Sequence, residues 1–465
     1  MSCPSRMINE CVWFIKFTWM SIIRELFLMD RRTFIKMALA SSAISTGRSV
    51  LGNPLPVSTN GAPMPAGNAG ATDEKYWDSV RAEFPITREL IYMNNGTMGP
   101  SPRAVTERVT RRIEYIDRTG EYNGDYAGLR VAIARMLNAE SGDQIAFTHN
   151  VSEAISIVAS GIDLKAGDEV LLTNQEHAGN AIPWLARKKR DGIVIKFIPL
   201  TDENARAYTD DDFIQRVSDA ITPRTRAISM PHITCTTGQL LPIKRLTALA
   251  REKASANGTP IWFLSDGAHP PGMLETDVRD LGVHAYASCG HKWVCGPKGI
   301  GFLYIEPELM HHVIPTWCGA EVDKYWGYEG RLDFLPTASR YDFATQNFAL
   351  FDGLHAAIDF MEKIGFDKIE ARVKYLTRTL RSGLQKISDG RFHFLTPDTS
   401  VTGLTTIKLD KMQYQDFANT LLSKYKVRTR VVPEGALDAN RFSVHIYTSE
   451  EDIQKFLEGA KSVLG

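Results

Sequence analysis

The stretch Ser288-Cys-Gly-His-Lys-Trp293 decides the fold prediction, because it leaves an apolar segment and carries reactive side chains. The residues that lead into it, Ala285–Ser288, form a short apolar run typical of a buried β-strand. His291 and Lys292 follow at once, where the chain leaves the edge of a sheet. A single lysine is usually a solvated surface charge, so the surrounding sequence has to decide between a surface and a site interpretation.

Similar apolar runs recur along the chain and are separated by helical patterns. Helix-like stretches such as Ser152–Ile162 and Ile243–Ala256 lie between them. This alternation predicts an α/β fold with a large, doubly wound and mainly parallel sheet. The predicted strands are Gln144–Thr148, Glu169–Thr173, Val194–Ile198, Ala227–Met230, Ile261–Leu264, Ala285–Ser288 and Gly301–Ile305.

The pattern changes after about Pro336. Two long helical stretches, Phe343–Ile364 and Ile369–Ile387, precede strand-like pieces at Leu404–Leu409 and Arg441–Tyr447. This order predicts a smaller α+β domain at the C-terminus. The expected limits are 75–95 for an N-terminal arm, 96–335 for the large domain and 336–465 for the small domain.

Several of the predicted strands end in polar or reactive side chains. In open α/β sheets, ligands bind outside the carboxyl ends of the strands. We therefore expect these ends to form one site. The residues concerned are His149 and Asn150 after Thr148, Glu176 and His177 after Thr173, Asp266 and His269 after Leu264, and His291 and Lys292 after Ser288.

The overall composition argues against some classes of partner but does not indicate a function. The chain has 465 residues and a formal net charge of zero, so nothing favours nucleic acid or an anionic membrane as a partner. Its six cysteines follow neither a disulfide framework nor a zinc spacing, and we expect no metal site.

A bacterial twin-arginine export signal is indicated near the N-terminus. Residues 30–36 read Asp-Arg-Arg-Thr-Phe-Ile-Lys, and the small apolar run Met37–Ile44 follows. The run is too short and too weak to span a bilayer, which takes about 20 apolar residues. We therefore expect the twin-arginine machinery to export the protein to the periplasm.

The segments on either side set the limits of this signal. Met29 is the expected true start, which makes residues 1–28 an upstream extension and residues 29–52 the signal. Residues 53–74 are rich in Pro, Gly, Ala and Asn and are expected to form a disordered linker.

A series of short motifs runs from Tyr92 to the C-terminus. They are Tyr92-Met-Asn-Asn-Gly-Thr97, Thr148-His-Asn-Val-Ser-Glu-Ala154, Glu176-His-Ala-Gly-Asn180, His232-Ile-Thr-Cys-Thr-Thr-Gly238, Asp266-Gly-Ala-His269, His291-Lys-Trp293 with Gly296-Pro-Lys-Gly299, and Arg441-Phe-Ser-Val-His-Ile-Tyr447. In this order and spacing they resemble the class V aminotransferase superfamily of fold-type-I pyridoxal-phosphate (PLP) enzymes. The likeness is greatest to the branch that contains isopenicillin N epimerase-like proteins.

The resemblance implies PLP as the cofactor and a role for each motif. Lys292 would form the Schiff base with the cofactor, and Asp266 would face its ring nitrogen. Val151, Ser152 and His291 would contact the phosphate, since helix N-termini favour anions. Three further cofactor contacts are implied: His177 stacked on the ring, His269 in a place where relatives often carry Gln facing the phenolic oxygen, and Thr345 reaching the neighbouring subunit's phosphate after Ala344, which replaces the usual Gly.

The substrate side of the site follows from the same resemblance. Arg441 matches the arginine that grips the substrate carboxylate, for which planar bidentate pairing favours Arg over Lys. Arg340 is a second candidate for this role, and Asn95 in the first motif is a further substrate-binding candidate. Enzymes of this kind are homodimers, so we expect a homodimer.

The motifs determine the cofactor but leave the reaction open. Cysteine desulfurases use a cysteine on a late loop, and this chain has none after Cys318, which argues against that activity. The chain also resembles exported PLP enzymes that tailor pyoverdine siderophores. We therefore expect a periplasmic enzyme acting on an amino acid or peptidyl amino group. The alternatives are a C–S lyase, an aminotransferase or epimerase on a small amino acid, and a non-catalytic exported ligand-binding protein.

Overall fold

The computed structural model of the protein describes residues 70–465, apart from 88, 123, 125 and 203–206. The expected extension at 1–28, the twin-arginine signal at 29–52 and the linker up to residue 69 lie outside the described residues. Within the described ranges, no helix is long and apolar enough to cross a membrane.

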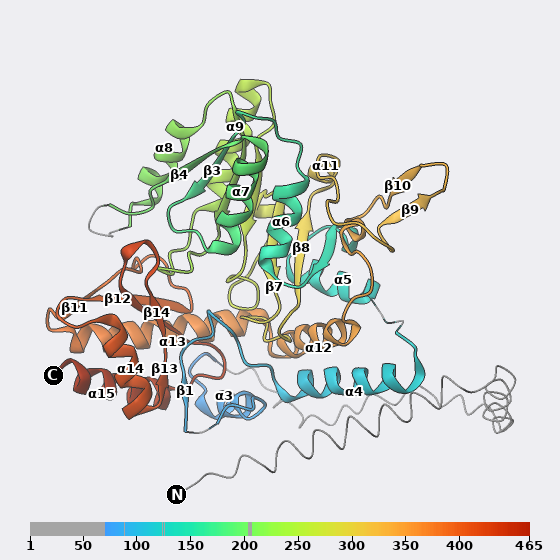
Figure 1. The fold of residues 1–465 in the computed structure, drawn as a ribbon. Coiled ribbons are helices and arrows are strands. Elements are labelled where there is room, and N and C mark those ends of the chain that lie inside the picture. The colour runs from blue at the N-terminus through green and yellow to red at the C-terminus, as the bar shows by residue number, and fades with distance from the viewer. Residues whose placement is uncertain (1–69, 88, 123, 125, 203–206) are drawn as a thin grey trace, which may run out of the picture. The chain divides into compact units, whose positions relative to one another are not determined.

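The large sheet has seven strands in the order β2-β8-β7-β6-β5-β3-β4 (Figure 1). Strands β4, β3, β5, β6 and β7 pair in parallel, whereas β8 is antiparallel to both of its neighbours. The predicted α/β class with a mainly parallel sheet is therefore confirmed. The strands are β2 (Ile145–Thr148), β3 (Glu169–Thr173), β4 (Val194–Ile198), β5 (Thr225–Pro231), β6 (Trp262–Asp266), β7 (Ala285–Cys289) and β8 (Gly301–Ile305).

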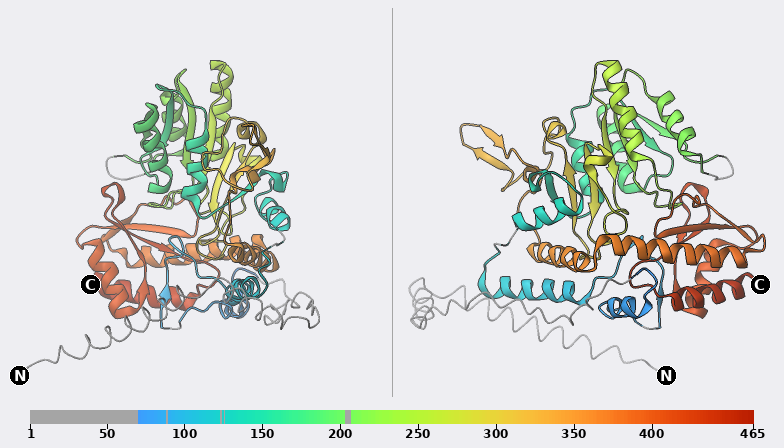
Figure 2. Two further views of the ribbon diagram at one scale, coloured as in Figure 1. Left: turned by 45° about the vertical axis from the view of Figure 1, so that its right-hand side comes forward. Right: turned by 180° about the vertical axis from the view of Figure 1, so that it is seen from behind.

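Helices cover both faces of this sheet (Figure 2). Strand β3 illustrates the cause, because Leu171 faces one apolar core whereas Val170 and Leu172 face the other. The helices of the first core are α5 (Tyr126–Met136), α8 (Asp210–Ala220), α9 (Ile243–Asn257) and α12 (Phe348–Ile364). Those of the second core are α6 (Val151–Gly161), α7 (Ala178–Asp191) and α11 (Pro307–Met310).

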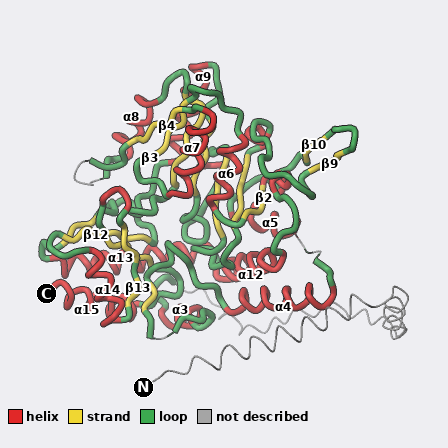
Figure 3. Tube along the Cα trace, viewed as in Figure 1, coloured by secondary structure: helices red, strands yellow, loops and turns green. Residues whose placement is uncertain are grey.

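The C-terminal part forms a second layer of sheet and helices. Its four-stranded sheet has the order β11-β12-β15-β14, with α13, α14 and α15 packed against it (Figure 3). The strands are β11 (Phe392–Phe394), β12 (Leu404–Leu409), β14 (Arg430–Val432) and β15 (Ala439–Ser443). The helices are α13 (Phe366–Ser388), α14 (Tyr414–Tyr425) and α15 (Glu450–Leu464).

The N-terminal part of the described chain joins these two layers. Strand β1 (Ile91–Tyr92) pairs in parallel with β13 (Val427–Arg428). Helix α4 (Arg103–Thr119) packs along α12, and α3 (Glu74–Arg81) precedes β1. The remaining α-helix is α10 (Val278–Leu281), and β9 (Asp323–Trp326) and β10 (Leu332–Phe334) form an antiparallel hairpin.

Two predicted elements have different limits in the structure. The helix expected from Phe343 begins only at Phe348, because Ala344 has a left-handed φ of 59° that interrupts a helix. The strand expected over Arg441–Tyr447 ends at Ser443, because the chain then turns and Thr448 Oγ1 accepts a hydrogen bond from the His445 N–H at 3.0 Å.

The packing of α12 bears on the expected domain limits, which stay a prediction. Its side chains Leu354, Ala357 and Ile358 are buried in the core of the large sheet, although they follow the expected boundary near residue 336. Helix α13 instead contributes Leu376 and Leu380 to the core of the small sheet. By packing, therefore, the change from one core to the other falls between these two helices.

Candidate active site

Most of the residues predicted for the site meet in one pocket of about 200 Å³. It lies where β6 and β7 end and α6 and α7 begin, which is the carboxyl edge of the parallel strands. The predicted residues that line it are Val151, Ser152, His177, Asp266, His291, Lys292 and Arg441. The local patterns therefore predicted a set of side chains that the fold brings together.

Lys292 is held by a close approach of two loops. It follows β7 in a turn in which Gly290 N–H donates to the Ile300 carbonyl at 3.0 Å. The Gly99 N–H donates to the His291 carbonyl at 2.7 Å, and a Cβ on Gly99 would lie only 2.1 Å from the Lys292 carbonyl oxygen. Only glycine fits there, so the loop after β1 sets the position of the lysine main chain.

Asp266 is a buried carboxylate at the end of β6. Its Oδ1 accepts a hydrogen bond from the Ala268 N–H at 3.0 Å. Burial raises the pKa of Asp266, and the positive charge of Lys292 acts in the opposite direction. A cationic group facing this carboxylate would therefore stabilise its charged form.

Two helix N-termini meet beside the lysine. Asn150 caps α6 by accepting the Glu153 N–H at 2.9 Å, so that Val151 and Ser152 form the first turn. A Cβ on Gly179, in the first turn of α7, would lie 2.4 Å from Ser152 Oγ. The two helix starts are thus packed together, and their N–H groups and dipoles favour an anion.

His177 and His291 complete this end of the pocket as neutral rings. Burial, and then the charge of Lys292, lower the pKa of both, that of His291 to about 4. His177 Nδ1 accepts the Gly179 N–H at 3.0 Å, which puts its proton on Nε2. Nδ1 of His291 is buried and has no hydrogen-bond partner within the described part of the chain.

His269 lies behind the pocket rather than in its lining. Its Nδ1 accepts a hydrogen bond from Trp293 Nε1 at 3.0 Å, so its proton is on Nε2. Burial lowers the pKa of His269 well below the usual value, and the ring is neutral. Nε2 is buried without a partner in the described chain and is available as a donor.

Arg441 lines the pocket, and Asn95 lies close to the Lys292 main chain, where both approach Gly99. Arg441 Nη1 donates to the Cys235 carbonyl, and Nη2 donates to Thr97 Oγ1 at 3.1 Å. Burial, and then the charge of Arg430, lower the pKa of Arg441 to about 9. Asn95 is buried next to this loop, where its Oδ1 accepts from Tyr447 Oη at 3.0 Å, but it does not line the pocket.

The structure does not bring Arg340 or Thr345 into the pocket. Arg340 Nε donates to the Leu335 carbonyl at 2.6 Å, so its guanidinium is tied to the main chain. Thr345 is exposed ahead of α12. Its expected contact belongs to a neighbouring subunit, so the position within one chain leaves that prediction open.

Several lining residues were missed by the sequence analysis. They include Gly96, Thr97, Cys235, Ala268, Cys289 and Arg430. Cys235 and Thr97 stand inside quoted motifs, and that membership was the signal in the sequence that could have found them. Arg430 stands in no motif, and only the pairing of β14 with β15 brings it to the site.

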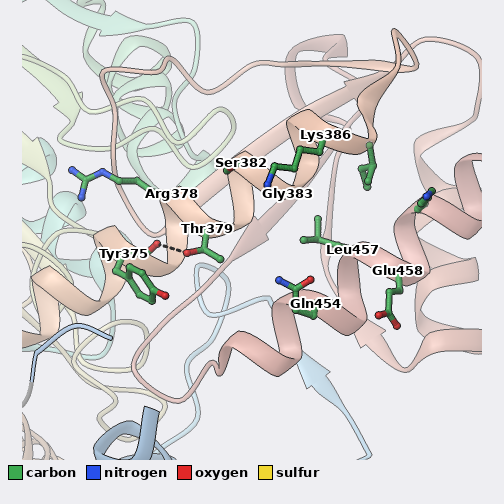
Figure 4. Close-up of a pocket in the computed structure, with 11 residues that line it drawn as sticks. Tyr375, Arg378, Thr379, Ser382, Gly383, Lys386, Gln454, Leu457 and Glu458 are labelled. Carbon is green, nitrogen blue, oxygen red and sulfur yellow. Dashed lines mark hydrogen bonds between the residues drawn. The ribbon is translucent and has the colours of Figure 1, made fainter. Parts of the chain in front are cut away.

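A larger hollow of about 570 Å³ lies elsewhere, between α13 and α15 (Figure 4). Arg378, Lys386 and Glu458 are among its lining side chains, and Leu457 packs directly against Gly383. None of the predicted site residues lines this hollow. Size therefore does not identify the site, whereas the grouping of lysine, buried carboxylate and arginine does.

The pocket beneath Lys292 fits PLP. It offers an amine, a buried carboxylate at Asp266 and an anion-binding pair of helix starts. The buried and unpaired atoms His291 Nδ1 and His269 Nε2 are polar groups that a bound ligand can satisfy.

Comparisons with known proteins agree with this assignment. The sequence model of the family described as Aminotransferase class-V matches residues 106–456. The chain is 29% identical over 412 residues to a probable cysteine desulfurase of Methanothermobacter thermautotrophicus, which covers 83% of this chain and 98% of that protein. It is 27% identical over 412 residues to isopenicillin N epimerase of Streptomyces clavuligerus, with 84% and 98% covered.

Solved structures point the same way. A mutant of C-DES with glycine covalently linked to its PLP cofactor is 27% identical to this chain, with a TM-score of 0.73 over 82% of this chain and 98% of that one. The complex of the cystine C–S lyase C-DES with its product cysteine persulfide gives a TM-score of 0.72 at 27% identity, with 81% and 99% covered. The chain therefore belongs to the class-V aminotransferase family, with a fold-type-I architecture and pyridoxal phosphate as its cofactor.

Proposed function

We propose that this PLP enzyme acts on the amino group of an amino acid or peptide, with Lys292 as the lysine that carries the cofactor. The observation that carries the proposal is the meeting of Lys292, Asp266 and Arg441 in one pocket of about 200 Å³. An amine, a buried carboxylate and a carboxylate-binding guanidinium are what an α-amino acid enzyme of this kind needs.

Bound PLP supplies an electron sink that stabilises negative charge at the substrate Cα. Asp266 would hold the proton on the ring nitrogen, and His177 would pack against the ring. Arg441 holds the substrate carboxylate and thereby orients the Cα bonds. Lys292 Nζ would hold the cofactor and, when a substrate amine displaces it, would remove or return a proton at Cα. His269, whose Nδ1 accepts from Trp293 Nε1, would present its Nε2–H to the bound cofactor as a hydrogen-bond donor.

The positions of the cysteines argue against cysteine desulfurase activity. Many relatives are named cysteine desulfurase, but such enzymes need an acceptor thiol on a late loop, and no cysteine follows Cys318. In the described chain, the thiols near Lys292 are Cys235 and Cys289, and burial raises the pKa of both, that of Cys289 to about 11. A thiol held in its protonated form is a poor acceptor.

A C–S lyase is the second candidate. Its support is the similarity to C-DES, which releases cysteine persulfide from cystine and is 27% identical over most of this chain. A lyase needs no acceptor thiol, which agrees with the cysteine pattern. An aminotransferase or epimerase is a further alternative, and the similarity to isopenicillin N epimerase supports it.

We further propose that the enzyme works in the periplasm and modifies a siderophore side chain of the pyoverdine kind. The support is the twin-arginine pattern at Arg31 and Arg32 together with the resemblance to exported enzymes of that group.

A homodimer is proposed as well. The exposed aromatic side chains Trp317, Trp326 and Tyr328, on and beside the β9–β10 hairpin, suit a protein partner.

The decisive test is a visible spectrum of the purified protein, followed by borohydride reduction and peptide mass mapping. We expect a phosphopyridoxyl group on Lys292. Lys292→Ala should abolish the label, whereas Lys298→Ala, a matched control six residues away and exposed, should keep it. A protein without bound cofactor would refute the assignment and favour a ligand-binding protein. A label on another lysine would refute the role of Lys292. Pyruvate and persulfide release from cystine then distinguishes the lyase from the other reactions.

A further inference from the structure

Two arginines face each other across paired strands at the substrate side of the pocket. Arg430 of β14 lies directly opposite Arg441 of β15 in the antiparallel register. Directly opposed residues project to the same face, with Cβ atoms about 4.5–5.5 Å apart. Both side chains line the pocket that contains Lys292. The site therefore holds two guanidinium groups side by side, where one suffices for an α-carboxylate.

Arg441 forms no ion pair with any of the described residues. Its hydrogen bonds go to neutral acceptors, the Cys235 carbonyl and Thr97 Oγ1. Its Nε is buried without a partner, and no carboxylate of the described residues forms an ion pair with it. The substrate α-carboxylate supplies the missing charge and acceptor.

One terminal nitrogen of the Arg430 guanidinium has a partner in the protein, and the other has none among the described residues. Glu434, four residues further on, pairs with Arg430 Nη2. Arg430 Nη1 is buried and has no hydrogen-bond partner within the described ranges. Glu434 thus orients the guanidinium and leaves Nη1 as an unpaired charged donor in the pocket wall.

An unpaired buried donor of this kind costs free energy until an acceptor reaches it. A substrate with a neutral side chain would leave Arg430 Nη1 without an acceptor, because Glu434 pairs only with Nη2. A substrate with a second carboxylate would satisfy the donor and offset the repulsion between Arg430 and Arg441.

We propose that Arg430 is a specificity-determining residue and that the substrate is an α-amino acid whose side chain carries a second carboxylate. Arg441 holds the α-carboxylate, and Arg430 Nη1 holds the distal one. The inference rests on the proposed function for the orientation of the substrate, but the paired anion site can be measured without turnover.

The experiment uses calorimetric titration of the purified holoenzyme with glutarate, a dicarboxylate, and with butyrate, a monocarboxylate of similar size. We expect the wild type to bind glutarate at least about 10-fold more tightly. Arg430→Gln should weaken glutarate binding on the order of 10- to 100-fold and leave butyrate unchanged. Arg441→Gln should weaken both ligands. Arg428→Gln, a matched control on the exposed face two residues away, should change neither.

Activity measurements complete the test. The ratio of kcat/KM for L-glutamate over L-glutamine should favour glutamate in the wild type and approach one in Arg430→Gln. Equal weakening of glutarate and butyrate would overturn the proposal, because Arg430 would then assist Arg441 on a single carboxylate. A wild type without preference for glutarate would overturn it too, whether or not the variant folds. Failure of the proposed function is a separate result, the absence of a borohydride-stable label on Lys292.

Discussion

Replacing Gly99 by Ala tests whether the loop after β1 positions Lys292, the proposed catalytic lysine. The new Cβ would lie 2.1 Å from the Lys292 carbonyl oxygen and 2.8 Å from Asn95 Oδ1. To reach an ordinary contact of 3.4 Å, the two loops have to separate by about 1.3 Å. That movement breaks the hydrogen bond from the Gly99 N–H to the His291 carbonyl, which is 2.7 Å long.

The expected cost has a structural and a catalytic part. Overpacking of this kind destabilises by about 1–3 kcal/mol. Displacing a reacting group by about 1 Å lowers the rate on the order of 100-fold. We therefore expect Gly99→Ala to lower kcat/KM by that factor and to weaken cofactor retention, because Lys292 moves relative to Asp266.

The assay combines steady-state kinetics, the cofactor absorbance after gel filtration and urea unfolding. Gly70→Ala is the matched control, since a Cβ there meets no atom within 4 Å and the residue is exposed. Kinetics within about threefold of the wild type, with unchanged unfolding, would refute the claim that this close approach sets the lysine position.

Three further predictions concern stability, cofactor binding and export. Burial alone would raise the pKa of Glu169, but hydrogen bonds from Lys196, Thr222 and Arg224 outweigh burial and lower this pKa to about 2. The charged carboxylate therefore stabilises the fold above pH 4.5, and this stabilisation is lost as the pH falls toward 2. Urea unfolding should show Glu169→Gln destabilised by up to about 3 kcal/mol at pH 7, with the gap closing in acid, and a constant gap would contradict this. Trp293→Phe removes the donor to His269 Nδ1 and should weaken PLP affinity of the apoenzyme measured by absorbance titration, whereas unchanged affinity would show that His269 needs no such support. Replacing Arg31 and Arg32 by Lys should leave the protein in the cytoplasm on fractionation, and continued export would rule out the twin-arginine route.

The fold class and the centre of the site were predictable because both follow from local patterns. A buried strand reads as a short apolar run, and the residue after it lies at the carboxyl edge of the sheet whatever the rest of the chain does. Lys292 after β7 and Asp266 at the end of β6 therefore came from the sequence directly. The Asn150 cap likewise marks the start of α6 in the sequence, but only the family resemblance assigned Val151 and Ser152 to the phosphate.

Element limits that depend on backbone strain or turns were less predictable. The apolar pattern of α12 extends back to Phe343, but the left-handed Ala344 delays the helix to Phe348. Such a φ is uncommon for alanine, and composition gives no sign of it. The early end of β15 at Ser443 has the same kind of cause, a turn closed by Thr448.

By itself, the sequence determined the parallel α/β sheet, the lysine that follows one of its strands and the carboxylate that follows another. Only the tertiary structure decided what surrounds them. Strand pairing places Arg430 opposite Arg441, and loop packing places Gly99 on Lys292. The fold also places Arg340 outside the pocket, where its Nε donates to the Leu335 carbonyl. The physical reason is that strand register and loop contacts join residues far apart in the chain, whereas apolar periodicity reports only on near neighbours.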